Sequence, residues 1–232
     1  MAGGRAAGRR ALPHVTVGLF GLLVLGGVAL SLASAPAVAV TELHTAARAT
    51  LAASGFDLTD TNTATPSGPS GGERAAEVIR VRYQAPDAVE ETGPDATGHQ
   101  VTVRVVGSRR FVLVGGTWTE RSPVRDLGAQ VVQSFLFPVR AVAAAPEVTG
   151  GPTLFRVVPA HEAAFVTRLL GRPRASLSGL AVTARVRGDV LVSEHVSAVL
   201  GGERLQVDLA FSAVGEAAPV RVPPARRAAP AG

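Results

Sequence analysis

Some local strings contain residue types that carry out chemistry in enzymes, but each lacks part of what that chemistry requires. The string Gly68-Pro69-Ser70-Gly71-Gly72 matches the G-x-S-x-G pattern, which places a nucleophilic serine on a sharp turn between a strand and a helix. Here the string lies in a segment rich in Ser, Thr, Pro and Gly, and that composition predicts a loop. A secreted hydrolase is therefore the less favoured reading of this chain.

Metal and cofactor chemistry are also not favoured. His161-Glu162 begins like the H-E-x-x-H helix that binds zinc, but Phe165 stands where the second histidine would be. His195, beside Glu194, lies in an alternating segment, which predicts an exposed strand residue and not a metal ligand. The chain has no cysteine, which excludes thiolate metal sites, iron–sulfur clusters and a cysteine nucleophile. We expect no catalytic residue, no bound metal, no cofactor and no enzymatic activity.

The net charge of +5 and the pI near 11.2 suggest nucleic-acid binding until the charges are counted by region. Arg5, Arg9 and Arg10 precede a hydrophobic segment, which leaves 20 of the 23 cationic residues against 18 acidic ones, or +2, for the rest of the chain. These arginines alternate with apolar residues, as on a solvated strand face, and do not form the basic patch typical of a DNA-binding protein. We expect no nucleic-acid partner.

The N-terminal segment predicts export or membrane anchoring. Val15 to Val40 contains no charged residue, and Val15 to Ala35 is long enough to cross a bilayer as a helix. Arginines precede the segment, which favours a cytoplasmic N-terminus. The sequence allows a signal peptide cut after Ala37-Val38-Ala39 or an uncleaved single-span anchor, and both place the chain from Thr41 onward outside the cytoplasm.

Three regions follow from composition and periodicity: a signal peptide or anchor at 1–40, one domain at 41–223, and a disordered Pro/Ala-rich tail at 224–232. The domain is expected to begin with a helix from Leu43 to Ala53, a short strand from Phe56 to Thr61 and a loop to Gly72. Beyond residue 79, apolar and polar residues alternate over several stretches, which predicts strands with one face buried and one in water.

Two helices are expected in the middle of the domain, at Val124 to Phe137 and Ala160 to Leu170, and a single strand between them at Val148 to Val158. Pro138 is expected to kink or end the first helix. The final third alternates over 180–186 and 205–211, with a further strand expected at 190–200 between them. Glycine-containing turns separate these segments, which predicts an antiparallel meander that ends with a strand at 220–222.

This order of elements, together with several strings, resembles the LolA-like lipoprotein-carrier superfamily, and in particular envelope lipoproteins of the LppX/LprG type. The strings are VRYQAPD at 81–87, VVG at 105–107, GGTW at 115–118 and PVRVP at 219–223. The resemblance implies an α+β fold in which helices cover the concave face of a curved antiparallel sheet, an unclosed half-barrel. It also implies an apolar cavity that holds acyl chains. The chain departs from the family pattern because it lacks the cysteine that carries the lipid anchor.

The resemblance implies a non-enzymatic protein of the cell envelope that binds or transports a lipid or the acyl chain of a lipoprotein. Its expected partners are a lipid or acylated protein, the membrane, and an envelope protein. An acyl chain gains about 0.8 kcal/mol for each methylene that it buries, so such a site needs only an apolar lining. The residues expected to line it are Leu127, Val131, Phe135, Leu136 and Phe165. A membrane-anchored interaction or stress-sensing module on the same fold is the alternative.

Overall fold

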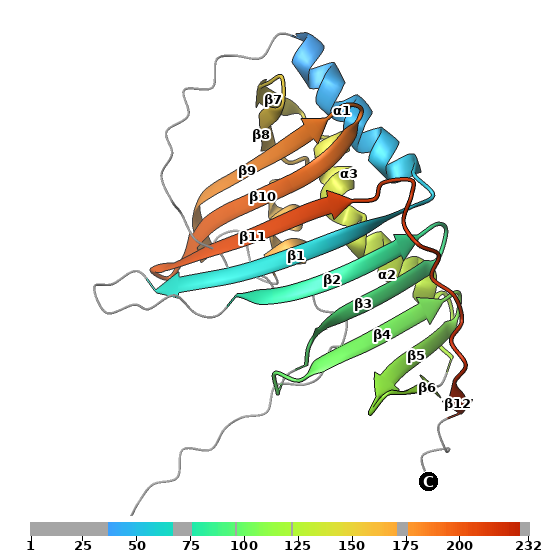
Figure 1. Ribbon diagram of the computed structural model, residues 1–232. Coiled ribbons are helices and arrows are strands. Elements are labelled where there is room, and N and C mark those ends of the chain that lie inside the picture. Colours follow the sequence, from blue (N-terminus) through green and yellow to red (C-terminus); the bar gives the residue numbers. More distant parts are fainter. Residues whose placement is uncertain (1–36, 67–75, 96, 122, 171–175, 228–232) are drawn as a thin grey trace, which may run out of the picture.

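The structure is a computed structural model that describes residues 37–66, 76–95, 97–121, 123–170 and 176–227. Its described part consists of one large sheet and four helices, and the helices lie on one side of that sheet (Figure 1). The helices are α1 (Ala37–Ala52), α2 (Leu127–Phe135), α3 (Phe137–Ala143) and α4 (Glu162–Leu170). None of them is long and apolar enough to cross a membrane. The segment Val15 to Ala35, expected to be a signal or an anchor, lies outside the described residues.

The sheet has twelve strands in the order β12-β6-β5-β4-β3-β2-β1-β11-β10-β9-β8-β7. The strands of its first half are β1 (Gly55–Pro66), β2 (Glu77–Gln84), β3 (Ala88–Pro94), β4 (Gln100–Val106), β5 (Arg109–Val114) and β6 (Thr117–Arg121). Those of the second half are β7 (Glu147–Gly150), β8 (Leu154–Val158), β9 (Leu177–Arg187), β10 (Val190–Leu200), β11 (Glu203–Ser212) and β12 (Arg226–Arg227).

The first eleven strands pair only in antiparallel fashion, and the strand order is linear, with β7 at one end and β12 at the other. β1 is the strand that joins the two halves, because it pairs with both β2 and β11. Its pairing with β11 runs from Asp57 opposite Ser212 to Pro66 opposite Glu203. The expected α+β fold with an unclosed antiparallel sheet is therefore confirmed.

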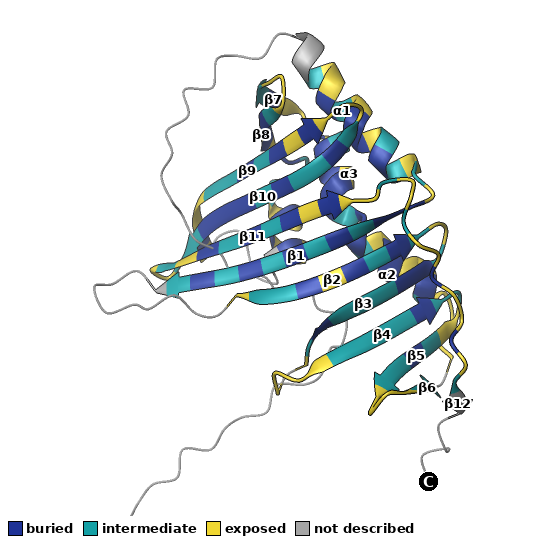
Figure 2. Ribbon diagram, in the orientation of Figure 1, coloured by how far each residue is buried: buried dark blue, intermediate teal, exposed yellow. Residues whose placement is uncertain are grey.

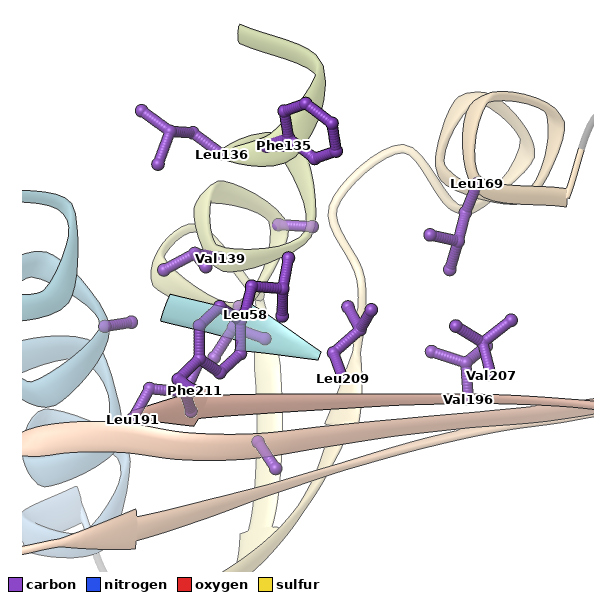
Figure 3. Packing of buried hydrophobic residues seen from close by; sticks show 14 of the residues in the cluster. Leu58, Phe135, Leu136, Val139, Leu169, Leu191, Val196, Val207, Leu209 and Phe211 are labelled. Atoms are coloured by element: carbon purple, nitrogen blue, oxygen red, sulfur yellow. The ribbon is translucent and has the colours of Figure 1, made fainter. Parts of the chain in front are cut away.

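Burial alternates along the strands and gives the sheet two different faces (Figure 2). On β11, Leu205, Val207, Leu209 and Phe211 are buried, while the residues between them are not. We call the face that carries these side chains the inner face, because the helices pack on it (Figure 3). The hydrophobic core of the protein lies between the inner face and the helices, as expected for a sheet with one apolar side.

The opposite, outer face explains why arginines alternate with valines in the sequence. A row of charged side chains crosses neighbouring strands there: Asp57, Arg82, Glu90 and Arg104. Arg82 Nε donates to Asp57 Oδ1 at 2.9 Å, and Arg104 is ion-paired with Glu90. These half-exposed pairs keep the outer face soluble and each contributes little to stability.

Helix α1 is fixed to the sheet by a buried hydroxyl at a β-bulge. On β10, Val192 is an extra residue between Leu191 and Ser193 that has no partner on β9. The N–H of Leu191 donates instead to Thr50 Oγ1 of α1 at 3.0 Å, and that hydroxyl donates to the carbonyl of Ala46 at 2.9 Å. Because a buried backbone N–H needs a partner, the bulge and the helix stabilise one another.

The beginning of α2 packs closely against two turns of the sheet. Gly128 donates its N–H to the carbonyl of Gly107 at 2.8 Å. A Cβ on Gly128 would lie 2.3 Å from the carbonyl oxygen of Asp87 and 2.6 Å from that of Gly107. Only a glycine allows this approach, which brings α2 against the β2–β3 and β4–β5 turns.

The structure corrects several expected boundaries in the middle of the chain. The helix expected at 124–137 is two helices separated at Leu136, because Pro138 lies in the first turn of α3, where its missing N–H costs nothing. The strand expected at 148–158 is the hairpin of β7 and β8, which turns at Gly151-Pro152. β1 extends to Pro66, five residues beyond its expected end, because its polar residues pair with β2 and β11.

The prediction of a strand at 220–222 is wrong. Those residues belong to a segment that crosses the ends of the strands on its way to β12 (Figure 1). The N–H of Val220 donates to Gln84 Oε1 at 2.7 Å, and Arg104 Nη1 donates to the carbonyl of Arg221 at 2.8 Å. Arg226 and Arg227, within the expected tail, pair in parallel with Thr119 and Glu120 of β6.

Candidate functional site

The structure brings the expected lining residues together in one hydrophobic cluster. Val131, Phe135 and Leu136 are each at most 5% exposed, Phe165 is 1% exposed, and Leu127 is partly buried against the same cluster. Val131 and Phe135 belong to α2, Leu136 follows the C-terminal end of α2, and Phe165 belongs to α4. Both helices face the inner side of the sheet. Whether a ligand contacts them stays a prediction, taken up below.

Aliphatic side chains from the helices pack against the inner face (Figure 3). Leu169 points from α4 toward Val196 and Val207 on the sheet, and Val139 of α3 lies above Leu58 and Phe211. All six side chains are at most 5% exposed. The aromatic ring of Phe56 adds to this surface, with its centroid 5.5 Å from that of Phe211.

Polar side chains interrupt this apolar face. Asp60 and Asn62 of β1 and Glu194 of β10 are 1%, 3% and 1% exposed, and the burial pattern places them on the inner face. None of their side-chain oxygens or nitrogens has a hydrogen-bond partner of normal geometry in the described structure, although the Asn62 amide lies near enough to Asp60 to lower the pKa of that carboxyl. We call these three residues the polar stripe. In folded proteins such groups are nearly always paired, so each needs a specific explanation.

Burial raises the pKa values of the two carboxyl groups in the polar stripe. Loss of hydration raises the pKa of Glu194 from 4.5 to about 8. The pKa of Asp60 rises from 3.8 to about 7, first because of burial and then because of the negative charge of Glu77 and Glu91, while Asn62 partly opposes the rise. Two carboxyl groups on the inner face therefore hold their protons close to neutral pH.

The strand register shows how the stripe is built. Asp60 and Glu194 both stand opposite Leu209, on either side of β11, so they lie two strands apart. Asn62 stands opposite Glu77 on β2. Glu77 and Glu91 surround the β1 end of the stripe, and burial raises the pKa of both. Arg110 partly offsets the rise at Glu91.

Sequence reasoning missed the stripe for two different reasons. Asp60 lies within the strand expected at 56–61, and Asn62 lies in the Thr-rich segment after it, which was expected to be a loop. Both continue the period-two pattern of Phe56 and Leu58. That continuation is the signal that could have found them. Glu194 faces inward because the bulge at Val192 changes the alternation of β10, and no feature of the sequence marks that bulge.

The chemistry-bearing residues singled out in the sequence do not form a catalytic arrangement in the described structure. His195 is half-exposed on the outer face, where its Nδ1 lies 2.6 Å from Asp208 Oδ1, and Gln206 donates to the other carboxylate oxygen. His161 precedes α4, and its carbonyl accepts the N–H of Phe165. Within the described ranges no three metal-ligating side chains gather closely enough to hold an ion. The GPSGG string lies outside those ranges.

Comparison with known proteins supports the fold. The sequence matches no protein-family model and no curated protein sequence. The solved structure of LprF from Mycobacterium bovis aligns with 82% of this chain and 98% of its own length, at 16% identity and a TM-score of 0.52. This likeness shows that the chain shares the fold of LprF.

Two further solved structures align less well. Lipoprotein LppX of Mycobacterium tuberculosis covers 81% of this chain at 16% identity, over its full length, with a TM-score of 0.49. A LolA superfamily protein from Nitrosomonas europaea covers 75% of this chain and 92% of its own, at 11% identity and a TM-score of 0.32.

Proposed function

We propose that this half-barrel binds the acyl chain of a lipid, or of a lipid-modified protein, between its sheet and its helices, and does so outside the cytoplasm without catalysing a reaction. The observation that carries the proposal is the extended, mainly apolar inner face, which short helices cover in the described part of the chain. The likeness to LprF supports the fold on which the proposal rests.

The energetics of such binding are favourable without any catalytic group. Each methylene that leaves water contributes about 0.8 kcal/mol, so a sixteen-carbon chain gains roughly 13 kcal/mol before the cost of ordering it is subtracted. Val131, Phe135, Leu136 and Phe165, with Leu127 at the margin, are the helical residues that we propose contact the chain.

Native mass spectrometry of the full chain tests the proposal directly. The protein is extracted from its producing cells in detergent-free copolymer particles, and we expect masses that correspond to protein plus lipid. A protein that carries no lipid, and that takes up no fluorescent fatty acid, would contradict the proposal.

A matched pair of variants locates the site. Val131→Trp adds a bulky ring to a residue that is 5% exposed on α2, where it would occupy space needed by the chain. We expect at least a fivefold loss of bound lipid, with circular dichroism showing that the fold persists. Val124→Trp, at a position 47% exposed just before α2, should leave the bound lipid unchanged.

The proposed export has its own test. The expected cut after Ala39 falls within the first turn of α1, which begins at Ala37. Cleavage there would shorten the helix and release the domain from the membrane, whereas an uncut chain would work as a tethered protein. N-terminal sequencing of the protein recovered from the cell envelope decides between the two.

A further inference from the structure

The polar stripe has a property that an acyl chain cannot explain. An alkyl chain offers no hydrogen bond, so Asp60, Asn62 and Glu194 would stay unpaired when it binds. Leaving a buried polar group unpaired is costly, and a pair of carboxyl groups could be replaced by leucines at no cost to an apolar site. Their presence on the inner face therefore points to a binding partner with polar groups at that position.

The charge around the stripe indicates which polar groups fit. Asp60 and Glu194 are carboxyls, and Glu77 and Glu91 add negative charge beside Asp60. Arg110 partly offsets this negative charge at Glu91. In the unliganded protein the buried carboxyls of Asp60 and Glu194 hold their protons close to neutral pH, and a donor with positive charge would lower their pKa and pair with the carboxylates. A phosphate or carboxylate group would instead raise their pKa further and gain no ion pair from them. A bare metal ion does not fit, because the described acids do not converge as a set of ligands.

The spacing of the stripe sets the size of the polar group. Asp60 and Glu194 flank Leu209 on β11. Neighbouring strands are about 4.8 Å apart, so the two backbones are separated by roughly 10 Å. Asn62 is two residues from Asp60 on the same face. A head group that contacts all three side chains must carry more than one donor.

We infer that the polar stripe of Asp60, Asn62 and Glu194 is a binding subsite for the head of a cationic amphiphile with two or more amine donors. Its alkyl part lies on the apolar surface beside the stripe, so the inference rests on the proposed lipid binding and specifies the class of lipid. The amines donate to the carboxyl groups and to the Asn62 amide oxygen, which gives each orphaned acceptor a partner.

Photo-crosslinking with chain-matched probes tests the inference on the full chain. The protein is held in copolymer particles with zwitterionic lipid, and each probe has a sixteen-carbon chain with a diazirine. The heads are N-alkyl-1,3-diaminopropane, a hydroxyl or a carboxylate. We expect the diamine probe to label peptides of β1, β10 and β11 at least tenfold more than the carboxylate probe.

Charge-removing variants with the same shape connect that preference to the stripe. The double variant D60N/E194Q keeps the size of both side chains but removes both carboxyls, and we expect it to lose the diamine preference while the hydroxyl probe still binds. Glu216→Gln, at an exposed position, is the matched control and should keep the preference. The labelling by each probe is compared between wild type and variants as a ratio, and this ratio is independent of how strongly the probe partitions into the lipid.

The outcomes separate the two proposals. Labelling by all three probes to the same extent, or a diamine preference that survives in D60N/E194Q, would overturn the cationic subsite and leave lipid binding in place. A complete lack of labelling on the inner-face strands by every probe would overturn lipid binding itself.

Discussion

Glu194→Gln isolates the energetic consequence of one buried carboxyl. The pKa of Glu194 rises from 4.5 to about 8 in the folded protein because the side chain is buried without a partner. Between these two values the folded chain holds the proton and the unfolded chain has lost it, so the free energy of unfolding falls as the pH rises. Glutamine has the same shape and no proton to lose, and it removes this dependence.

The size of the effect follows from the shift in pKa. By linkage, the pH-dependent gain in the free energy of unfolding of Glu194→Gln over wild type grows with pH. It is about 1 kcal/mol at pH 5, about 3 kcal/mol at pH 7 and about 5 kcal/mol at pH 9. Urea unfolding of a lipid-free chain that begins at Ala37, followed by the fluorescence of its single tryptophan, Trp118, measures the free energy at each pH. Glu216→Gln, on the surface, should show no such trend. A difference between Glu194→Gln and wild type that stays constant from pH 5 to pH 9 would refute the reasoning.

Two further substitutions test how the helices are held on the sheet. Thr50→Val should lower the free energy of unfolding by about 1 to 3 kcal/mol because it leaves the buried N–H of Leu191 unpaired, while Thr45→Val on the exposed side of α1 should have little effect in the same urea titration. Gly128→Ala should lower the melting temperature although alanine favours helices, because its Cβ would overlap the carbonyl oxygen of Asp87; an unchanged or higher melting temperature would show that α2 can move away without cost.

The sequence determined the fold class and most strands of this protein. Alternation over β11 and most of β9 needs only the pleat of a strand and one buried face, and glycine turns separate these strands from β10, so the sequence predicted the meander. Helical spacing likewise placed Val131 and Phe135 on one side of α2, where both are buried; their contact with a ligand stays a prediction.

Only the tertiary structure decided which polar residues face inward. Asp60 and Asn62 have low strand propensity, yet β1 extends through them because β2 and β11 supply partners on both sides. Glu194 points into the core because one extra residue at Val192 reverses the side on which the following residues lie, and that bulge depends on the hydroxyl of Thr50 in a distant helix. Local pattern fixes a strand and its two faces, whereas the face that each polar residue occupies depends on pairing with segments far away in the chain.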